Sequence, residues 1–135
     1  MKTTTAKKPR PTKKAQKKVA DPTRELARAA AQACHDHKGE EILVLDIAKL
    51  SSFADYFVIV SGSSDRQVRA LADAVEEGLS KQAERPQSIE GYDQGRWILL
   101  DYGSVVAHIF QKEVRPHYAL EEFWHKARQV KFSLK

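Results

Sequence analysis

The short run Cys34-His35-Asp36-His37 contains the residue types that bind zinc. Cys34 and His37 lie three residues apart, so both can occupy one face of a helix. A zinc site needs three or four protein ligands, and the sequence offers neither a second cysteine nor another histidine pair to complete one. We therefore expect no metal here. Cys34 is predicted to pack as a small apolar residue, with both histidines at a solvated helix end.

Gly62-Ser63 lies where a predicted strand meets a predicted helix, a position at which backbone N–H groups can bind phosphate. Nucleotidyltransferases use such a Gly-Ser turn together with paired carboxylates that hold Mg²⁺ on a neighbouring strand. Asp65 and Asp73 follow in the helix and form no Asp-x-Asp pair on a strand. Asp65 is better explained as a first-turn acid that stabilises the helix dipole. The sequence does not support a two-metal site.

Asp101 and His108 lie on the two strands of a predicted hairpin, where an acid–base pair is conceivable. No nucleophile has a defined spacing to them, and the G-x-S-x-G motif is absent. A histidine whose hydrogen bonds are satisfied within the sheet is the preferred interpretation. None of the three groups predicts an enzyme, so we expect no catalytic residue and no cofactor.

The chain divides into a basic tail and a mildly acidic body. Residues 1–20 hold eight basic residues and no acid, whereas residues 21–135 hold 15 basic and 18 acidic residues. With a single valine and two prolines, residues 1–20 are predicted to be disordered, either as a solubilising terminus or as an arm attracted to nucleic-acid phosphates. No run reaches the roughly 18 apolar residues of a membrane span. The lack of a secretory signal and the single cysteine favour the cytoplasm.

The body is predicted to be one domain at residues 21–130, followed by a short C-terminal tail at residues 131–135. Apolar periodicity and turn residues predict, in order, a helix at 23–37, strands at 42–45 and 56–60, a helix from Ser64, an edge strand at 87–90, a hairpin of 97–101 with 105–110, and a last helix from Arg115 to about Arg128. Helices and strands interleave without strict alternation. The fold class is therefore mixed α+β, with one mixed sheet covered by helices.

Aromatic residues interleaved with acids near the hairpin and the last helix indicate a protein-docking surface. The aromatic residues are Trp97, Tyr102, Phe110, Tyr118, Phe123 and Trp124, and the acids are Asp101, Glu121 and Glu122. Aromatic anchors beside carboxylates suit a basic protein partner. Strand alternation places Trp97, Leu99 and Asp101 on one face. The alternative is that the aromatic residues are core, which fits Trp124 better than Trp97 or Tyr118.

Three motifs follow one another along residues 22–127. They are DYFVIVSG at 55–62 with RQVRA at 66–70, then EG at 90–91 with WILLDYG at 97–103 and VVAHIF at 105–110, and last R-x-x-Y-x-L-E-x-x-W at 115–124. Their order and spacing resemble the Iojap family, the ribosomal silencing factors RsfS. The resemblance implies a nucleotidyltransferase-like fold that lacks the catalytic acids, and hence a protein without enzyme activity.

The resemblance further implies binding to the large ribosomal subunit through large-subunit ribosomal protein fourteen, which blocks joining of the small subunit and represses translation. By motif, the docking residues are Trp97, Leu99, Asp101, Tyr118 and Glu121. The carboxylates among them suit a basic partner. Ser104 stands where the family usually has Asp, and Pro116 where an acid is common, so negative charge near this surface is reduced.

Two other hypotheses remain beside the ribosome-binding factor: a nucleotidyltransferase-like enzyme, and a nucleic-acid-binding module driven by the basic tail. The tail lies outside the family core and is a candidate contact to rRNA. A homodimer of the free protein also remains open. No membrane partner is expected.

Overall fold

The computed structural model describes residues 21–115 and 125–135. The predicted basic tail lies outside the described residues, as do Tyr118 and Glu121 of the predicted docking surface. In the described part of the chain, no helix is long and apolar enough to cross a membrane.

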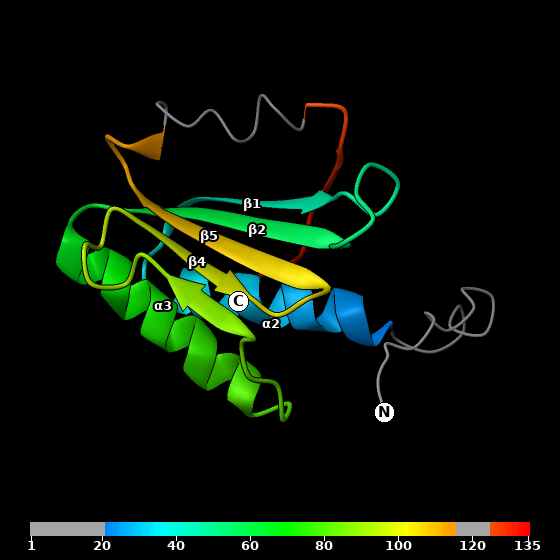
Figure 1. Cartoon of the computed structure of the whole chain (residues 1–135), viewed down its shortest axis with the longest axis horizontal. Helices are drawn as coiled ribbons and strands as arrows, with labels where there is room; N and C mark the ends of the chain where they lie inside the picture. The colour runs from blue at the N-terminus through cyan, green and yellow to red at the C-terminus, as the bar shows by residue number, and fades with distance from the viewer. Residues whose placement is uncertain (1–20, 116–124) are drawn as a thin grey trace.

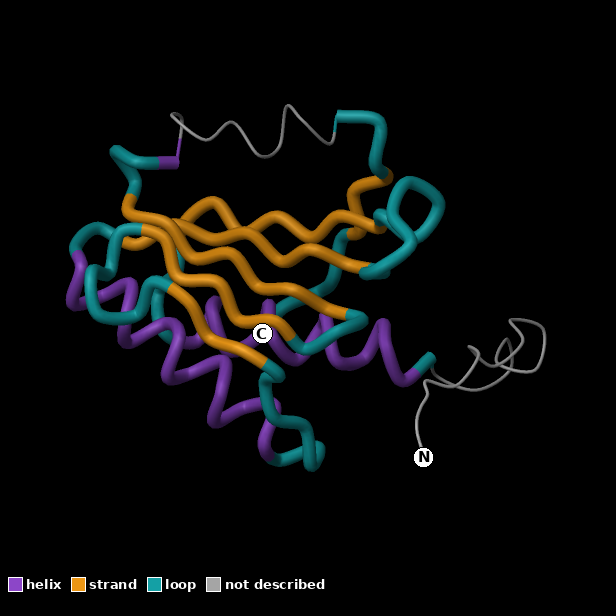
Figure 2. The backbone as a smooth tube through the Cα atoms, viewed as in Figure 1, coloured by secondary structure: helices purple, strands orange, loops and turns teal. Residues whose placement is uncertain are grey.

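A mixed sheet with two helices on one of its faces forms the body (Figure 1, Figure 2). The elements are α2 (Pro22–Asp36), β1 (Glu40–Asp46), β2 (Tyr56–Gly62), α3 (Asp65–Ser80), β3 (Ser88–Glu90), β4 (Trp97–Asp101), β5 (Val105–Gln111) and β6 (Arg128–Val130). The six strands run in the order β3-β4-β5-β2-β1-β6. β2 and β5 are parallel, and the other neighbours are antiparallel. The predicted fold class is confirmed.

Both helices begin with a capped first turn. Asp21 Oδ1 accepts a hydrogen bond from Thr23 N at 3.0 Å, with Pro22 in the first helical position of α2. In α3, Ser64 Oγ accepts from Gln67 N at 3.1 Å. The apolar face of α3 is buried throughout, at Val68, Leu71, Ala72, Val75 and Leu79. Cys34 is buried on α2, as predicted.

The strands divide the core into two clusters, one on each face of the sheet. The cluster under the helices includes Ile98 and Leu100 of β4, which are fully buried. The opposite face carries a second cluster that includes Phe57 and Phe110, with Trp97 packed at its side. Alternation along β4 therefore places Trp97, Leu99 and Asp101 on the face away from the helices, as the sequence predicts.

Arg115 fastens the chain after β5 to the pair β1–β2. Its Nη1 donates to Ser61 Oγ at 2.7 Å and to the carbonyl oxygen of Glu41 at 2.9 Å. Glu41 has a φ of 52° and lies in an irregularity of the β1–β2 ladder, between the register pairs of Glu40 and Leu43. The buried guanidinium thus donates to a backbone carbonyl at this irregularity.

The prediction that the last helix continues to about Arg128 is wrong. Arg128 does not end a helix, because residues 128–130 form strand β6, which pairs antiparallel with β1. Val130 is buried opposite Val44, while Arg128 and Gln129 are exposed. A three-residue edge strand with one buried side chain is too short to show an alternating pattern in the sequence.

Residues 131–135 return to α2. The Arg24 guanidinium lies 5.0 Å from the centre of the Phe132 ring, and Lys135 N donates to Gln32 Oε1 at 3.2 Å. Phe132 and Leu134 pack against the helix-side cluster. The segment predicted as a short tail therefore contributes apolar contacts to the body.

Replacing Gly91 or Gly78 by alanine should change stability in opposite directions. Gly91 has a φ of +80°, and a Cβ there would collide with the backbone carbonyl of Trp97. Gly91→Ala should therefore destabilise the fold by about 2 kcal/mol or more. At Gly78, inside α3, a Cβ would meet only Ala33 Cβ at 3.5 Å, so Gly78→Ala should stabilise the fold by roughly 0.5–1 kcal/mol. Urea unfolding of both variants measures the change in the free energy of unfolding. A change in the same direction for both variants would contradict this account.

Acid should destabilise the fold through His108. The side chain is 4% exposed on β5, and burial lowers the pKa of its imidazole to about 4. Between about pH 6.5 and pH 4 the unfolded chain binds a proton at His108 that the folded chain does not. The free energy of unfolding should therefore fall towards acid over this interval, by up to about 3 kcal/mol from this group.

Urea unfolding at about pH 7 and about pH 4.5 measures that loss. His108→Gln and His108→Phe both remove the titrating group and should flatten the pH dependence. His35→Gln, at an exposed position of α2, is the matched control and should keep the wild-type slope. A wild-type slope in both His108 variants would show that other groups cause the acid sensitivity.

Candidate protein-docking face

Three predicted docking residues form a row on β4, which we call the docking face: Trp97, Leu99 and Asp101. All three are partly exposed and lie on the sheet face opposite the helices. Their register partners on β5 are Phe110, His108 and Val106. The other two predicted residues, Tyr118 and Glu121, lie outside the described residues.

The Trp97 indole is held in place from β5. Its ring stacks on Phe110, with ring centres 5.1 Å apart and planes 21° apart. The indole Nε1–H donates to His108 Nδ1 at 3.2 Å. An aromatic ring fixed by both a stack and a hydrogen bond loses little further freedom when a partner covers it. Trp97 is therefore a partly exposed aromatic ring held in one orientation at one end of this row.

His108 supports Trp97 and is not part of an acid–base pair. Because the indole N–H donates to Nδ1, the neutral ring must carry its proton on Nε2. Among the described residues, no hydrogen-bond acceptor faces that buried Nε2–H. The prediction of a fully satisfied sheet histidine is therefore right for Nδ1 and wrong for Nε2. His108 lies opposite Leu99 and not Asp101.

Asp101 combines a structural hydrogen bond with an available charge. Its Oδ1 accepts from Gly103 N at 2.8 Å, which stabilises the turn between β4 and β5. Gly103 has a φ of +85°, a conformation that glycine adopts readily. Within residues 21–115 and 125–135, no cation forms an ion pair with Asp101. A cationic group of a partner can therefore pair with this carboxylate.

The other groups with chemical potential have structural partners. Burial raises the pKa of the Cys34 thiol to about 12. Asp65 pairs with Arg69 at 3.0 Å, and the guanidinium hydrogen bond lowers the pKa of the Asp65 carboxyl. Asp73 accepts a hydrogen bond from the Tyr92 hydroxyl at 3.0 Å. In the described residues, no group of three or more His, Cys, Asp and Glu side chains could hold a metal ion.

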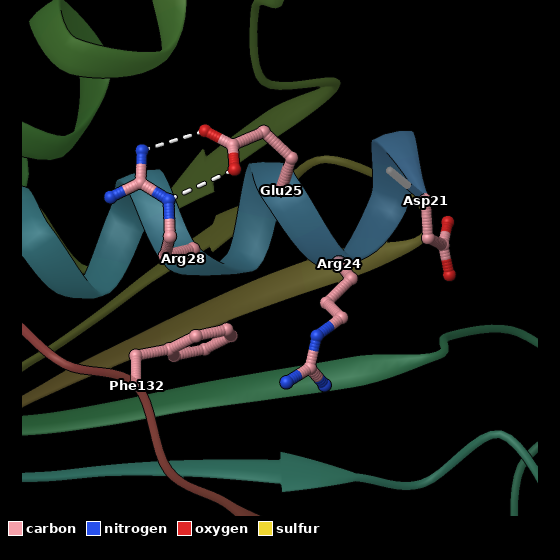
Figure 3. A pocket seen from close by; sticks show the side chains of 5 residues that line it. All are labelled: Asp21, Arg24, Glu25, Arg28 and Phe132. Atoms are coloured by element: carbon pink, nitrogen blue, oxygen red, sulfur yellow. Dashed lines mark hydrogen bonds and ion pairs between the residues drawn. The ribbon is translucent and has the colours of Figure 1, made fainter. Parts of the chain in front are cut away.

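An open hollow of about 220 Å³ lies on the helix side of the molecule, away from the docking face. Figure 3 shows its lining, which is Asp21, Arg24, Glu25, Arg28 and Phe132. Glu25 accepts two hydrogen bonds from Arg28, at 2.6 and 2.9 Å, and Arg24 lies over Phe132. These charges are engaged with one another and with the ring. We therefore assign the hollow a structural role, the attachment of residues 131–135 to α2.

Sequence reasoning missed the role of His108 and Phe110 as supports of Trp97. The signal was present, because an antiparallel hairpin with its turn at residues 102–104 puts Trp97 opposite Phe110 and Leu99 opposite His108. The hydrogen bond between the indole and the imidazole depends on side-chain rotamers, which a register does not define.

Comparison with known proteins identifies the family. Residues 20–135 match the family model described as "Ribosomal silencing factor during starvation", RsfS. The ribosomal silencing factor RsfS of Bacillus subtilis is 41% identical over 99 residues, which cover 73% of this chain and 84% of that protein. A mouse protein named "Mitochondrial assembly of ribosomal large subunit protein 1" is 33% identical over 87 residues, which cover 62% of this chain and 38% of that protein.

Solved structures agree with the family match. A crystal structure of a Chromobacterium violaceum protein superposes with a TM-score of 0.75 at 34% identity, covering 84% of this chain and 93% of that chain. A crystal structure from Bacillus halodurans superposes with a TM-score of 0.72 at 36% identity, covering 81% of this chain and 99% of that chain. The match over residues 20–135, together with these relatives, shows that the chain belongs to the RsfS family of ribosomal silencing factors.

Proposed function

We propose that this protein binds the large ribosomal subunit through large-subunit ribosomal protein fourteen and thereby blocks joining of the small subunit. It acts by occupying a surface, without catalysis, as a repressor of translation in the cytoplasm. Family membership supports the ribosome-associated silencing role. The name of the mouse relative, which refers to the large ribosomal subunit, supports the choice of subunit.

The row of Trp97, Leu99 and Asp101 is the observation that carries this proposal. An ordered indole, an aliphatic side chain and a carboxylate that forms no ion pair within the described residues follow one another along a single strand. Such a strip offers an apolar centre that a partner can desolvate and a charge that orients a basic surface. Ser104 adds no negative charge to the turn beside Asp101, so the apolar contacts supply more of the affinity.

An enzyme related to the nucleotidyltransferases is the less favoured alternative. Its chemistry would need carboxylates that hold Mg²⁺ at the end of a strand. Asp65 and Asp73, which follow Gly62-Ser63 in the chain, lie on α3 and are engaged with Arg69 and Tyr92. The docking function has the better support, since its three described residues share one face.

Sedimentation tests the proposal directly. The protein should pellet with isolated large subunits, and its presence should lower the amount of complete ribosome formed when small subunits are added. Binding to the small subunit alone, or undiminished joining at saturating protein, would reject the proposal.

Trp97→Ala and Asp101→Lys should each fold and yet lose the ability to block subunit joining. Truncation of an aromatic anchor at a desolvated centre weakens binding by about 2 kcal/mol or more, roughly thirtyfold. Reversal of the Asp101 charge puts like charges together at a basic partner. Large-subunit binding and thermal unfolding are measured for both variants.

Two conservative variants separate docking from folding. Trp97→Phe keeps a ring to stack on Phe110 and should retain part of the affinity, while Asp101→Asn keeps an oxygen that can accept from Gly103 N and removes only the charge. If Trp97→Ala unfolds the domain, Trp97→Phe decides between a core and a docking role. Full activity in all folded variants would place the docking surface elsewhere.

A shortened chain of residues 21–135 should still bind large subunits, with a slower on-rate and a weaker salt dependence. The eight basic residues of the tail attract rRNA phosphates over a screened distance of about 10 Å and carry no apolar anchor. Binding rates at two salt concentrations test this division of roles between the basic tail and the body. Complete loss of binding by the shortened chain at moderate salt would favour the tail-driven nucleic-acid module.

A further inference from the structure

The loop between β1 and β2, residues 47–55, exposes large apolar side chains to solvent. Among the described residues, three large apolar side chains are exposed, and two of them lie in this loop: Phe53 at 79% and Leu50 at 45%. The third, Ile89 at 40%, lies on the edge strand β3. Clustered exposure of large apolar groups marks interaction sites on protein surfaces.

The loop is held in shape by its own hydrogen bonds. Leu50 N and Ser51 N both donate to the carbonyl oxygen of Ile47 at 2.9 Å. Ser51 Oγ accepts from Phe53 N at 3.1 Å and from Ala54 N at 3.3 Å. Ile47 and Ala54 are buried at the base of the loop. The backbone therefore presents Phe53 to solvent from a fixed position, at a low entropic cost of binding.

The loop adjoins the Asp101 end of the docking face. The carbonyl oxygen of Ser104, in the turn that Asp101 stabilises, accepts from Asp55 N at 2.8 Å and from Tyr56 N at 3.1 Å. Ile47 and Ala54 belong to the cluster on the sheet face opposite the helices, the face that carries the docking row. Figure 1 shows the loop extending from the ends of β1 and β2, away from both helices.

The docking face alone is small for a stable interface. Trp97 to Asp101 spans about 13 Å along β4, at roughly 3.3 Å per residue. A stable interface typically buries about 800 Å² on each partner. A protein seated on the row must therefore extend beyond it, and the loop supplies exposed apolar groups at the Asp101 end.

The charge of the loop favours a protein over a nucleic acid. Residues 47–55 contain one acid, Asp55, and one base, Lys49. A surface that binds a phosphate backbone needs several cations, whereas an aliphatic and an aromatic side chain exposed on one loop suit an apolar hollow on a protein.

We propose that Leu50 and Phe53 form a second apolar contact with the protein that covers Trp97, Leu99 and Asp101, and that they insert into an apolar hollow beside its basic patch. The inference rests on the proposed docking function and adds the loop to the docking surface. Asp101 then lies between two apolar contacts, Trp97 at one end and Phe53 beyond the other.

Phe53→Ser and Leu50→Ser in the full chain test this contact, with isolated large ribosomal subunits as the probe. Each should weaken large-subunit binding, Phe53→Ser by about tenfold or more, because exposed anchors lose their burial in the complex. Thermal unfolding should be nearly unchanged, since both side chains are solvent-exposed. Ile89→Ser is the matched control: it removes an exposed apolar side chain from β3 and should bind as the wild type does.

The outcomes separate the loop contact from the docking function. Failure of the wild-type protein to bind large subunits would reject the docking function, and the loop contact with it. Wild-type affinity in both loop variants, while Trp97→Ala binds weakly, would overturn the loop contact alone. If the loop variants lost as much affinity for protein-free large-subunit rRNA as for the complete subunit, the loop contact would also be overturned, in favour of a nucleic-acid contact. A change in the oligomeric state of free Phe53→Ser with unchanged binding would instead assign the loop to self-association.

Discussion

The parallel pairing of β2 with β5 is the constraint on which the arrangement of the molecule depends. Seven register pairs join them, from Tyr56 with Val105 to Gly62 with Gln111, and every residue of β2 is buried. Parallel neighbours cannot be joined by a tight turn, so the chain must cross over between them, and it does so through α3 followed by β3 and β4. The pairing also brings the start of β2 and the start of β5 to one end of the sheet, which is why residue 104 meets residues 55 and 56.

The two faces of the sheet have different coverings, and this difference creates the docking face. α2 and α3 cover one face, where Ile98 and Leu100 are fully buried. The opposite face has its own apolar cluster, whose side at β4 is left partly exposed. Trp97 lies at this boundary, with one side of its ring on Phe110 and its N–H bound to His108. The neutral, buried imidazole is therefore a condition for a fixed indole, since a protonated ring could not accept that hydrogen bond.

Local patterns predicted most of the fold, and failed where tertiary contacts decide. Periodicity and turn residues located α3 because the five apolar residues of its face obey a helical period, and alternation assigned the two faces of β4 correctly. Strand β6 escaped prediction because its pairing with β1 is long-range and only Val130 is buried. The unsatisfied Nε2 of His108 and the exposure of Phe53 depend on packing around them, which no local pattern encodes.

Under the proposed function, the separation of a basic tail from a mildly acidic body helps the protein to bind the ribosome. A ribosomal surface presents basic proteins embedded among rRNA phosphates, so a body with three more acids than bases is attracted to the former and repelled by the latter. The eight basic residues of the tail offset that repulsion, and because the Debye length is about 8 Å at physiological ionic strength, they act mainly on nearby phosphates. Tail charge then governs encounter, while Trp97 and Asp101 govern retention on the correct protein. Positive and negative charges on one surface would partly neutralise each other and weaken both attractions. Their separation along the sequence therefore serves both the encounter with the ribosome and retention on it.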